Sequence, residues 1–400
     1  MKTNHISLLF CLILIFSCES IFASIASVSF VLGKVERISN SGAVTKVTKK
    51  TRFDSSDKII TSKNGQIMLT MADKSKITIR PKSTFIIKDY SYKKNVKEDK
   101  SHYNLVKGGF RYVTGVMGKS KRSSYKLNTV VGTIGIRGTD FEATICDDNC
   151  QNQSGLFVNV VSGGISLTNK GKSLLVDSGQ YGHIDSAESA PEKVRELPSA
   201  MIIESSPVQG VSKPTYATPE EQMVAIALRQ SPSSKTKTIN TDELVEAGFT
   251  AKSILGGATR IGLEPANVTN AIIESGVDSS KVIEESILQF PNHATKIITM
   301  GVATRSINIE QAKQIGSKRG VSQRNLKSAV TSGKLLRPPV VQKKKSDNKE
   351  NKRVDSPDKK QNDKMPVENK SQNQPTDKKR VNPQLIPKNE NSGGSVPSPS

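Results

Sequence analysis

Cys146 and Cys150 are the two residues of this sequence whose spacing most directly implies a covalent bond. Asp147-Asp148-Asn149 separates them, and a polar run of this kind is typical of a tight turn that brings its two ends together. In an exported protein, one close pair of cysteines predicts a disulfide. A metal site is the alternative, but it would need further Cys or His ligands nearby, and the sequence supplies none.

A second suggestive stretch runs from Leu127 to Phe141, where Gly132, Gly135 and Gly138 interrupt a strand-like run. Glycines inside strands mark bulges, bends or places where another backbone approaches closely. Arg137 lies between two of these glycines, so its guanidinium could satisfy carbonyls exposed at a bend. We interpret the stretch as an architectural corner, in which Thr139 hydrogen-bonds locally and Phe141 points into the core. The alternative is a ligand clamp that would comprise Gly135, Arg137, Gly138 and Thr139.

No set of residues has the spacing of a catalytic site. Beyond residue 23 the histidines are far apart, and neither H-E-x-x-H nor G-x-S-x-G occurs. Asp140 and Glu142 alternate on an expected strand and so share a face, but we interpret them as solvated surface residues rather than an acid/base pair. We expect no enzyme activity, no bound metal and no small-molecule cofactor. The three histidines are His102, His183 and His293.

The first 23 residues predict the compartment. Lys2 precedes an apolar run from Ile6 to Phe16, and a small residue, Ala23, stands at a plausible cleavage point. This is the pattern of a signal peptide, because the apolar run is shorter than the roughly 20 residues of a membrane span. An uncleaved anchor and a lipoprotein modified at Cys18 are the alternatives. We expect an exported bacterial protein, in the periplasm, at the cell surface or secreted.

Charge is unevenly distributed along the chain. The net charge is +22, of which residues 24–186 carry +13, residues 187–333 carry +1 and residues 334–400 carry +8. A positive surface attracts polyanions, and outside the cytoplasm nucleic acid is not an expected partner. We expect an envelope protein, an acidic polysaccharide or an anionic lipid surface, while a merely solvated surface is the alternative. Aromatic residues make up 4% of the chain, which argues against a stacking surface for sugars or bases.

Three further regions follow the signal segment. Residues 24–186 show short runs of alternating apolar and polar residues between Gly- and Asn-containing turns, which predicts an all-β domain of the antiparallel sandwich or roll type. Residues 187–240 are rich in Ser, Pro and Thr and predict a linker with one short helix, Pro219 to Gln230. Residues 334–400 lack apolar periodicity, so we expect a disordered basic tail.

Residues 241–333 predict a small α-helical repeat region. Gly248, Gly262 and Gly276 are evenly spaced, and the same sequence pattern begins again at Gly320. Each unit resembles a short helix that a glycine ends in the left-handed conformation. One such helix cannot bury its apolar face alone, so we expect the units to stack. The stretch from Pro291 to Arg305 fits the period poorly.

The run from Gly135 to Phe141 resembles the G-V-R-G-T-x-F hallmark of the FecR domain family. Other pieces of the family pattern occur in the same order, although Ser56 and Lys74 stand where that pattern has glycine. The resemblance covers about residues 24–186. The pieces are Gly33–Val35, Asp57–Thr61, Met71–Ser75, Pro81–Thr84, Leu105–Gly109, Val161–Ile165 and Asp177–Gln180.

The resemblance implies an exported β scaffold that binds another envelope component and has no enzyme activity. Founding members of the family regulate a sigma factor through a cytoplasmic region that precedes a membrane span. This sequence begins directly with the signal segment, so we expect a binding or scaffold protein rather than a sigma-factor regulator. The alternative is a periplasmic signal-transduction component linked to an outer-membrane receptor.

Overall fold

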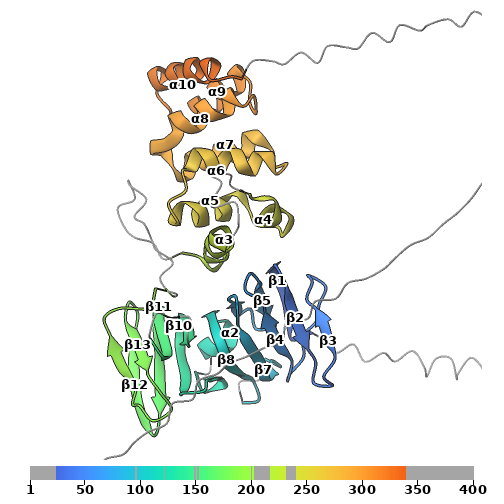
Figure 1. Cartoon of the computed structure of the whole chain (residues 1–400), viewed down its shortest axis with the longest axis vertical. Coiled ribbons are helices and arrows are strands. Elements are labelled where there is room, and N and C mark those ends of the chain that lie inside the picture. The colour runs from blue at the N-terminus through green and yellow to red at the C-terminus, as the bar shows by residue number, and fades with distance from the viewer. Residues whose placement is uncertain are drawn as a thin grey trace, which may run out of the picture. The chain divides into compact units, whose positions relative to one another are not determined.

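The computed structural model describes residues 24–94, 97–120, 122–147, 150, 153–199, 201, 217–230 and 240–338. Within these residues, a strand-rich region is followed by a run of helices (Figure 1). The predicted signal segment, residues 1–23, lies outside the described residues, as does all of the predicted tail beyond residue 338.

Fourteen strands of the described residues form one hydrogen-bonded sheet, which confirms the predicted all-β region. Among the described residues, neighbouring strands pair antiparallel except for the parallel pair β8–β9. The strands are β1 (Ala26–Leu32), β2 (Val35–Ile38), β3 (Val44–Lys46), β4 (Lys58–Thr61), β5 (Gln66–Met71), β6 (Lys76–Ile79), β7 (Thr84–Ser91), β8 (Lys100–Val113), β9 (Tyr125–Asn128), β10 (Thr133–Cys146), β11 (Gly155–Asn169), β12 (Lys172–Asp177), β13 (Tyr181–Ile184) and β14 (Glu192–Val194).

The long strand β8 organises this sheet. Its first half pairs with β7 and β9, and its second half pairs with β6 and β10. Side chains of β8 that point to one face, such as Tyr103, Phe110 and Tyr112, are fully buried in an aromatic core with Tyr125 and Phe141. The prediction that Phe141 points into the core is therefore confirmed.

The sheet extends further than the predicted boundary at residue 186. Strand β14 pairs with β13 through Tyr181, Gly182 and His183, so part of the predicted linker belongs to the β region. Ser56 and Lys74 are among the non-glycine residues that adopt the left-handed conformation. Their φ values are 72° and 66°, and they stand where the FecR pattern has glycine.

The helices of the second region pack on one another, and the most extensive contacts join helices two apart in the chain, α8 with α10 and α3 with α5 (Figure 1). The expected helix from Pro219 to Gln230 is present as α3. The helices are α2 (Val116–Ser120) and η1 (Arg122–Ser124) within the β region, followed by α3 (Pro219–Gln230), α4 (Asp242–Glu246), α5 (Ala251–Arg260), α6 (Pro265–Glu274), α7 (Ser279–Gln289), η3 (Pro291–His293), α8 (Ala294–Ala303), α9 (Ile309–Lys318) and α10 (Gln323–Leu335).

Glycines with positive φ end four of these helices. Gly248, Gly262, Gly276 and Gly320 have φ between 73° and 88°, in the left-handed region that suits a helix C-terminus. After α8, the residue with positive φ is Arg305, at 62°. An arginine in this place explains why the spacing of glycines breaks down between residues 291 and 305. That the helices repeat one common unit stays a prediction.

The start signals of the helices act as expected. The Asp278 carboxylate accepts from the Lys281 backbone N–H at 2.8 Å, and the Ser322 hydroxyl accepts from the Asn325 N–H at 3.3 Å. Pro265 occupies the first turn of α6. Within the part of the chain that the structure describes, no helix combines the length and apolar character needed to cross a membrane.

Candidate functional site

The hallmark stretch forms a tight corner between β10 and β11. The register of the pair shifts between Arg137 and Asp140, where the backbone of β10 bulges. Gly138 and Gly163 both have positive φ, at 61° and 78°. A Cβ atom on Gly163 would lie 2.2 Å from the Gly138 carbonyl oxygen, so the two backbones touch and only glycine fits.

Thr139 holds this corner together. Its hydroxyl accepts from the Arg137 N–H at 3.1 Å and donates to the Gly164 carbonyl at 2.5 Å. The Thr139 backbone N–H donates to the Thr114 hydroxyl at 2.8 Å, which in turn donates to the Thr139 carbonyl at 2.7 Å. The expected local bonding of Thr139 is confirmed, and it satisfies groups that the bulge would otherwise leave unpaired.

The Arg137 guanidinium was expected to satisfy carbonyls at the bend, but it lies beside a carboxylate instead. Its side chain is 55% exposed, and its guanidinium lies 3.5 Å from the Asp177 carboxylate of β12, which is 52% exposed. Gly135 lies next to β11, where an added Cβ would be 2.6 Å from the Ser166 hydroxyl. The structure therefore brings Gly135, Arg137, Gly138 and Thr139 together as a corner. Ligand binding by Arg137 stays a prediction.

A second site starts one residue further along β10. Asp140, Glu142 and Thr144 alternate and so share one face of the sheet, opposite to the aromatic core. The cross-strand partner of Glu142 on β8 is Arg111, which lies between the core residues Phe110 and Tyr112. Arg111 donates to both carboxylate oxygens of Asp140, from Nε at 2.8 Å and from Nη2 at 2.7 Å.

Glu142 is the centre of this buried network. Its carboxylate lies 2.9 Å from Nη2 of Arg80 and 3.8 Å from Nη1 of Arg111. The Gln222 side chain of α3 also donates to it. Glu142 is 2% exposed, so our interpretation of it as a solvated surface residue is wrong. Covering by α3, 80 positions later in the sequence, is the physical reason.

The network balances its own charge. Two arginines, Arg80 and Arg111, face two carboxylates, Asp140 and Glu142, and all four are largely buried. Burial by itself would lower the pKa of the Arg111 guanidinium, but the hydrogen bonds and charge of Asp140, with Glu142, raise that pKa above its usual value. Buried charges are tolerated only when they are paired in this way.

Helix α3 is tied to the same face along its N-terminal half. Nη1 of Arg111 donates to the Ala217 carbonyl just before the helix at 2.6 Å, and the Gln66 side chain donates to the Met223 carbonyl at 3.1 Å. Lys76 of β6 lies 3.0 Å from Glu220. Burial opposes ionisation of Glu220, but its backbone hydrogen bond and Lys76 lower the pKa of this carboxyl.

Apolar contacts extend this surface of the sheet beyond α3. Leu32 and Met68 belong to the buried cluster of the helical region rather than to the aromatic core. The rings of Phe30 and Phe249 stack with centroids 4.2 Å apart. We call this surface, from Asp140 and Glu142 to Phe30, the helix-facing seam of the sheet.

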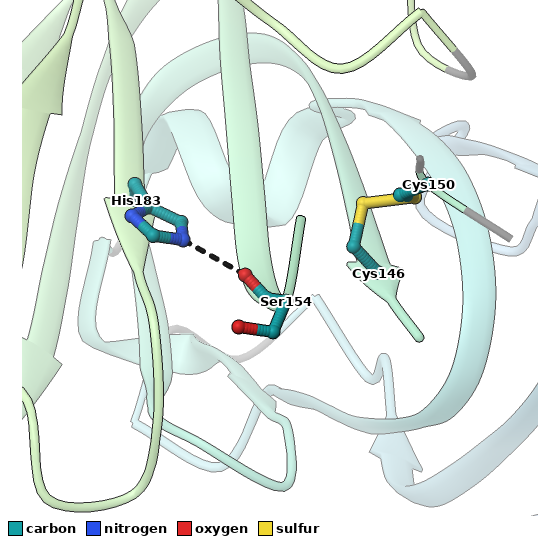
Figure 2. The surroundings of a disulfide bond; sticks show 4 residues. All are labelled: Cys146, Cys150, Ser154 and His183. Atoms are coloured by element: carbon teal, nitrogen blue, oxygen red, sulfur yellow. Dashed lines mark hydrogen bonds between the residues drawn. A yellow bond between two sulfur atoms is a disulfide. The ribbon is translucent and has the colours of Figure 1, made fainter. Parts of the chain in front are cut away.

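Cys146 and Cys150 form the expected disulfide at the end of β10. Figure 2 shows it near Ser154 and His183, which are joined by a bond of 2.9 Å between the His183 Nε2 and the Ser154 carbonyl. His183 also stacks on Phe157, with ring centroids 4.1 Å apart. The disulfide, Phe157 and Met201 form a small buried cluster of their own. The disulfide therefore fixes the end of strand β10.

The seam residues that sequence reasoning missed are Arg80, Arg111 and Gln222. Arg111 carried no signal, because a charged residue between two aromatic ones is equally typical of a strand with one face in water. Gln222 carried none, since its role depends on where α3 lies. No group of three or more potential metal ligands occurs among the residues placed in the structure.

Comparisons with known proteins identify the β region. The family model described as "FecR protein" matches residues 57–166, from just before β4 into β11. This part of the chain is therefore a FecR domain, and the resemblance drawn from the hallmark stretch is confirmed. No curated protein matches the chain.

Two solved structures are similar to the chain. Both are described as a "putative anti-sigma factor" from Parabacteroides distasonis ATCC 8503, with 11% and 10% identity and TM-scores of 0.29 and 0.28. Each match covers 35% of this chain and 60% of that one. The chain thus spans less than two thirds of those structures, and scores of this size establish no shared role.

Proposed function

We propose that the chain is a non-enzymatic, exported protein of the bacterial envelope whose FecR domain binds an envelope protein or an anionic envelope component. The FecR match supports an envelope role. The helix-facing seam is the observation that carries the binding role, because it joins the FecR domain to the helical region through buried, paired charges. A fixed connection of this kind suits a protein that presents one surface on the FecR domain and another on the helical region.

The chemistry of the seam favours binding over catalysis. Asp140 and Glu142 are the two carboxylates of β10, and each forms an ion pair with an arginine. A general base needs a lone pair within hydrogen-bond reach of a substrate proton. Carboxylates held between Arg80, Arg111 and α3 stabilise a fold instead.

Two features support export and an anionic partner. A disulfide between Cys146 and Cys150 persists in oxidising compartments outside the cytoplasm, which agrees with the signal-like start of the sequence. The net charge of +13 in residues 24–186, against +1 in residues 187–333, supports attraction of an anionic partner to the β region, which contains the FecR domain.

Signal transduction linked to an outer-membrane receptor is the second candidate. The FecR match favours it, because founding members of that family transmit a signal across the envelope. In this version the FecR domain would contact a receptor or a membrane-spanning regulator, and the helical region would contact the next component.

Retention on isolated envelopes tests the proposal. A variant with Lys88, Lys126 and Lys172 of the FecR domain changed to Gln should elute at lower salt than the unchanged chain, because exposed charge pairs are screened by salt. A matched control changes Lys281, Lys327 and Lys334 of the helical region and should elute like the unchanged chain.

Equal elution of both variants, or binding that ignores salt, would count against the anionic partner. Photo-crosslinking in living cells from the same FecR positions would then identify what is bound. A receptor or membrane regulator supports the signalling version, a polymer or lipid supports the scaffold version, and the absence of any envelope crosslink contradicts both.

A further inference from the structure

A cavity of about 320 Å³ lies beside the C-terminal half of α3, at the end of the helix-facing seam. The turn after β6, the middle of β8 and the end of β10 form its walls on the sheet side, and Ile226, Arg229 and Gln230 of α3 form the other side. This size falls at the lower end of the range for pockets that hold small organic ligands. From Arg137 the cavity is about 20 Å away along β10, so it is separate from the hallmark corner.

The cavity is strongly basic. Five of its described lining residues are cationic and one, Asp147, is acidic. The Asp147 carboxylate lies 3.9 Å from the Lys107 ammonium, and Glu142 pairs with Arg80. A concave surface with one sign of charge concentrates ions of the opposite sign. The five cationic residues are Lys63, Arg80, Lys82, Lys107 and Arg229.

Two buried polar groups at the cavity have unused hydrogen-bonding capacity. Thr144 is 8% exposed and its hydroxyl has no hydrogen-bond partner in the structure. Nη2 of Arg80, which is 7% exposed as a residue, makes its ion pair with Glu142 without hydrogen-bond geometry. A buried hydroxyl without a partner is destabilising, and an acceptor oxygen of a ligand would supply the missing hydrogen bond.

Space beside Thr144 is kept open by a glycine. A Cβ atom on Gly109 would lie 2.7 Å from the Thr144 hydroxyl and 3.3 Å from Cδ of Arg80. Apolar walls at Pro81, Ile145 and Ile226 surround the remaining volume. The cavity therefore offers cations and donors at one place and an apolar surface for the body of a small molecule.

We propose that this pocket binds the phosphate group of a small organic phosphate, either a free phosphate ester or the headgroup of a phospholipid. A phosphate carries up to two charges and three acceptor oxygens, which suit several lysines, an arginine and a hydroxyl donor. The proposal goes beyond the proposed function, because it assigns a specific ligand to a pocket rather than a partner to the surface of the FecR domain.

Titration calorimetry with the full chain tests it, using inorganic phosphate and glycerol phosphate as soluble probes. Vesicles of phosphatidylglycerol, compared with phosphatidylcholine, serve as the lipid probe. Changing Lys63 and Lys107 together to Gln should weaken binding about tenfold or more, because it removes two charge-assisted contacts. The control changes Lys281 and Lys327 to Gln, which are exposed on the helical region and do not line the pocket, and should leave affinity unchanged.

Thr144→Val separates a ligand role from a structural one. Removing a hydroxyl that has no partner should leave the thermal midpoint unchanged or raise it, while affinity for the phosphate probe falls several-fold. Saturable binding of glycerol phosphate that depends on Lys63, Lys107 and Thr144 supports a free ester. Binding of phosphatidylglycerol vesicles alone, with the same dependence, supports a headgroup.

The proposal is overturned if neither glycerol phosphate nor phosphatidylglycerol vesicles bind, or if the Lys281 and Lys327 control loses as much affinity as the pocket variant. Either failure leaves the proposed function standing, since envelope retention is measured separately with its own variants. If the unchanged chain is not retained on envelopes but binds glycerol phosphate, the proposed function is contradicted and the pocket proposal stands.

Discussion

The two faces of strands β8 and β10 are buried by different kinds of contact, apolar packing on one and paired charges on the other. Phe110, Tyr112 and Phe141 face an aromatic core whose rings pack with centroids 5.6 Å and 6.1 Å apart. The residues between them, Arg111 and Glu142, face α3 and are paired charge to charge. Both faces are buried, but one is closed by apolar area and the other by directed contacts.

This difference separates stability from specificity. Apolar burial is non-directional and holds the sheet together whatever lies against it. A buried ion network is satisfied by one arrangement of partners only, so it selects where α3 lies. We infer that the aromatic face makes the FecR domain fold and that the seam decides how the helical region joins it.

Phe141→Ala should have the largest effect on the aromatic face. It removes a fully buried ring and leaves a cavity, so the free energy of unfolding should fall by about 4 kcal/mol. Urea denaturation measures this, and the loss should not depend on salt. Phe141→Leu is the control and should cost less, because it keeps most of the volume. A loss below about 1 kcal/mol for the alanine variant would contradict the packing described.

Glu142→Gln should come next. The side chain keeps its shape but leaves Arg80 and Arg111 with one carboxylate between them, which should cost about 3 kcal/mol. Urea denaturation measures the loss, and limited proteolysis should show earlier cleavage near α3. Asp89→Asn, which breaks an exposed pair with Lys100, is the matched control and should cost under about 1 kcal/mol. Equal losses in the two variants would mean that the seam has no special role.

Thr139→Val tests the corner. Without the hydroxyl, the Arg137 N–H and the Gly164 carbonyl lose their partner, at a cost of about 1–3 kcal/mol. Thermal unfolding measures the cost. Thr139→Ser keeps the hydroxyl and should recover most of it. If serine does no better than valine, the hydroxyl is not what holds the corner.

Glu220→Gln should remove a pH-dependent part of the seam. Because the pKa of Glu220 is lower in the folded state, its pair with Lys76 stabilises above the ordinary glutamate pKa of about 4.3 and is lost as pH falls through the folded pKa. The pair is partly exposed, so we expect about 0.5 kcal/mol at pH 7. Denaturation at pH 7 and at about pH 3 should show a difference between the two proteins only at pH 7. A difference that persists in acid would rule this pair out as its cause.

Arg137→Ala should have the smallest effect on stability. Both members of its pair with Asp177 are more than half exposed, so the change should stay within about 0.5 kcal/mol. Thermal unfolding checks this value, with Asp177→Ala as the matched control. A large destabilisation by Arg137→Ala alone would show that the guanidinium supports the corner directly.

Much of the fold could be predicted from local patterns. Alternation on β10 predicts that Phe141 faces the core, and the spacing of Cys146 and Cys150 predicts the disulfide, because both depend on neighbouring residues. Helix α3 was also predictable from its own residues. Arg305 was not, since a non-glycine residue with positive φ leaves no sign in the sequence.

The seam could not be predicted for a different reason. Asp140 and Glu142 were predicted to share a face, and they do, but the environment of that face depends on α3, which lies 80 positions beyond Glu142. A charged residue on a strand has the same local pattern whether water or a helix covers it. Distance along the chain therefore hides the part of the structure on which the proposed function depends.

Hydrogen exchange of the α3 backbone amides, residues 220–230, tests most directly whether the seam joins the two regions. We expect these amides to be protected in the unchanged chain, and we expect Glu142→Gln to speed their exchange while the amides of β8 beside Phe110 and Tyr112 stay protected. If the α3 amides exchange freely in the unchanged chain, or if their protection survives Glu142→Gln unaltered, the seam does not hold the helical region on the FecR domain.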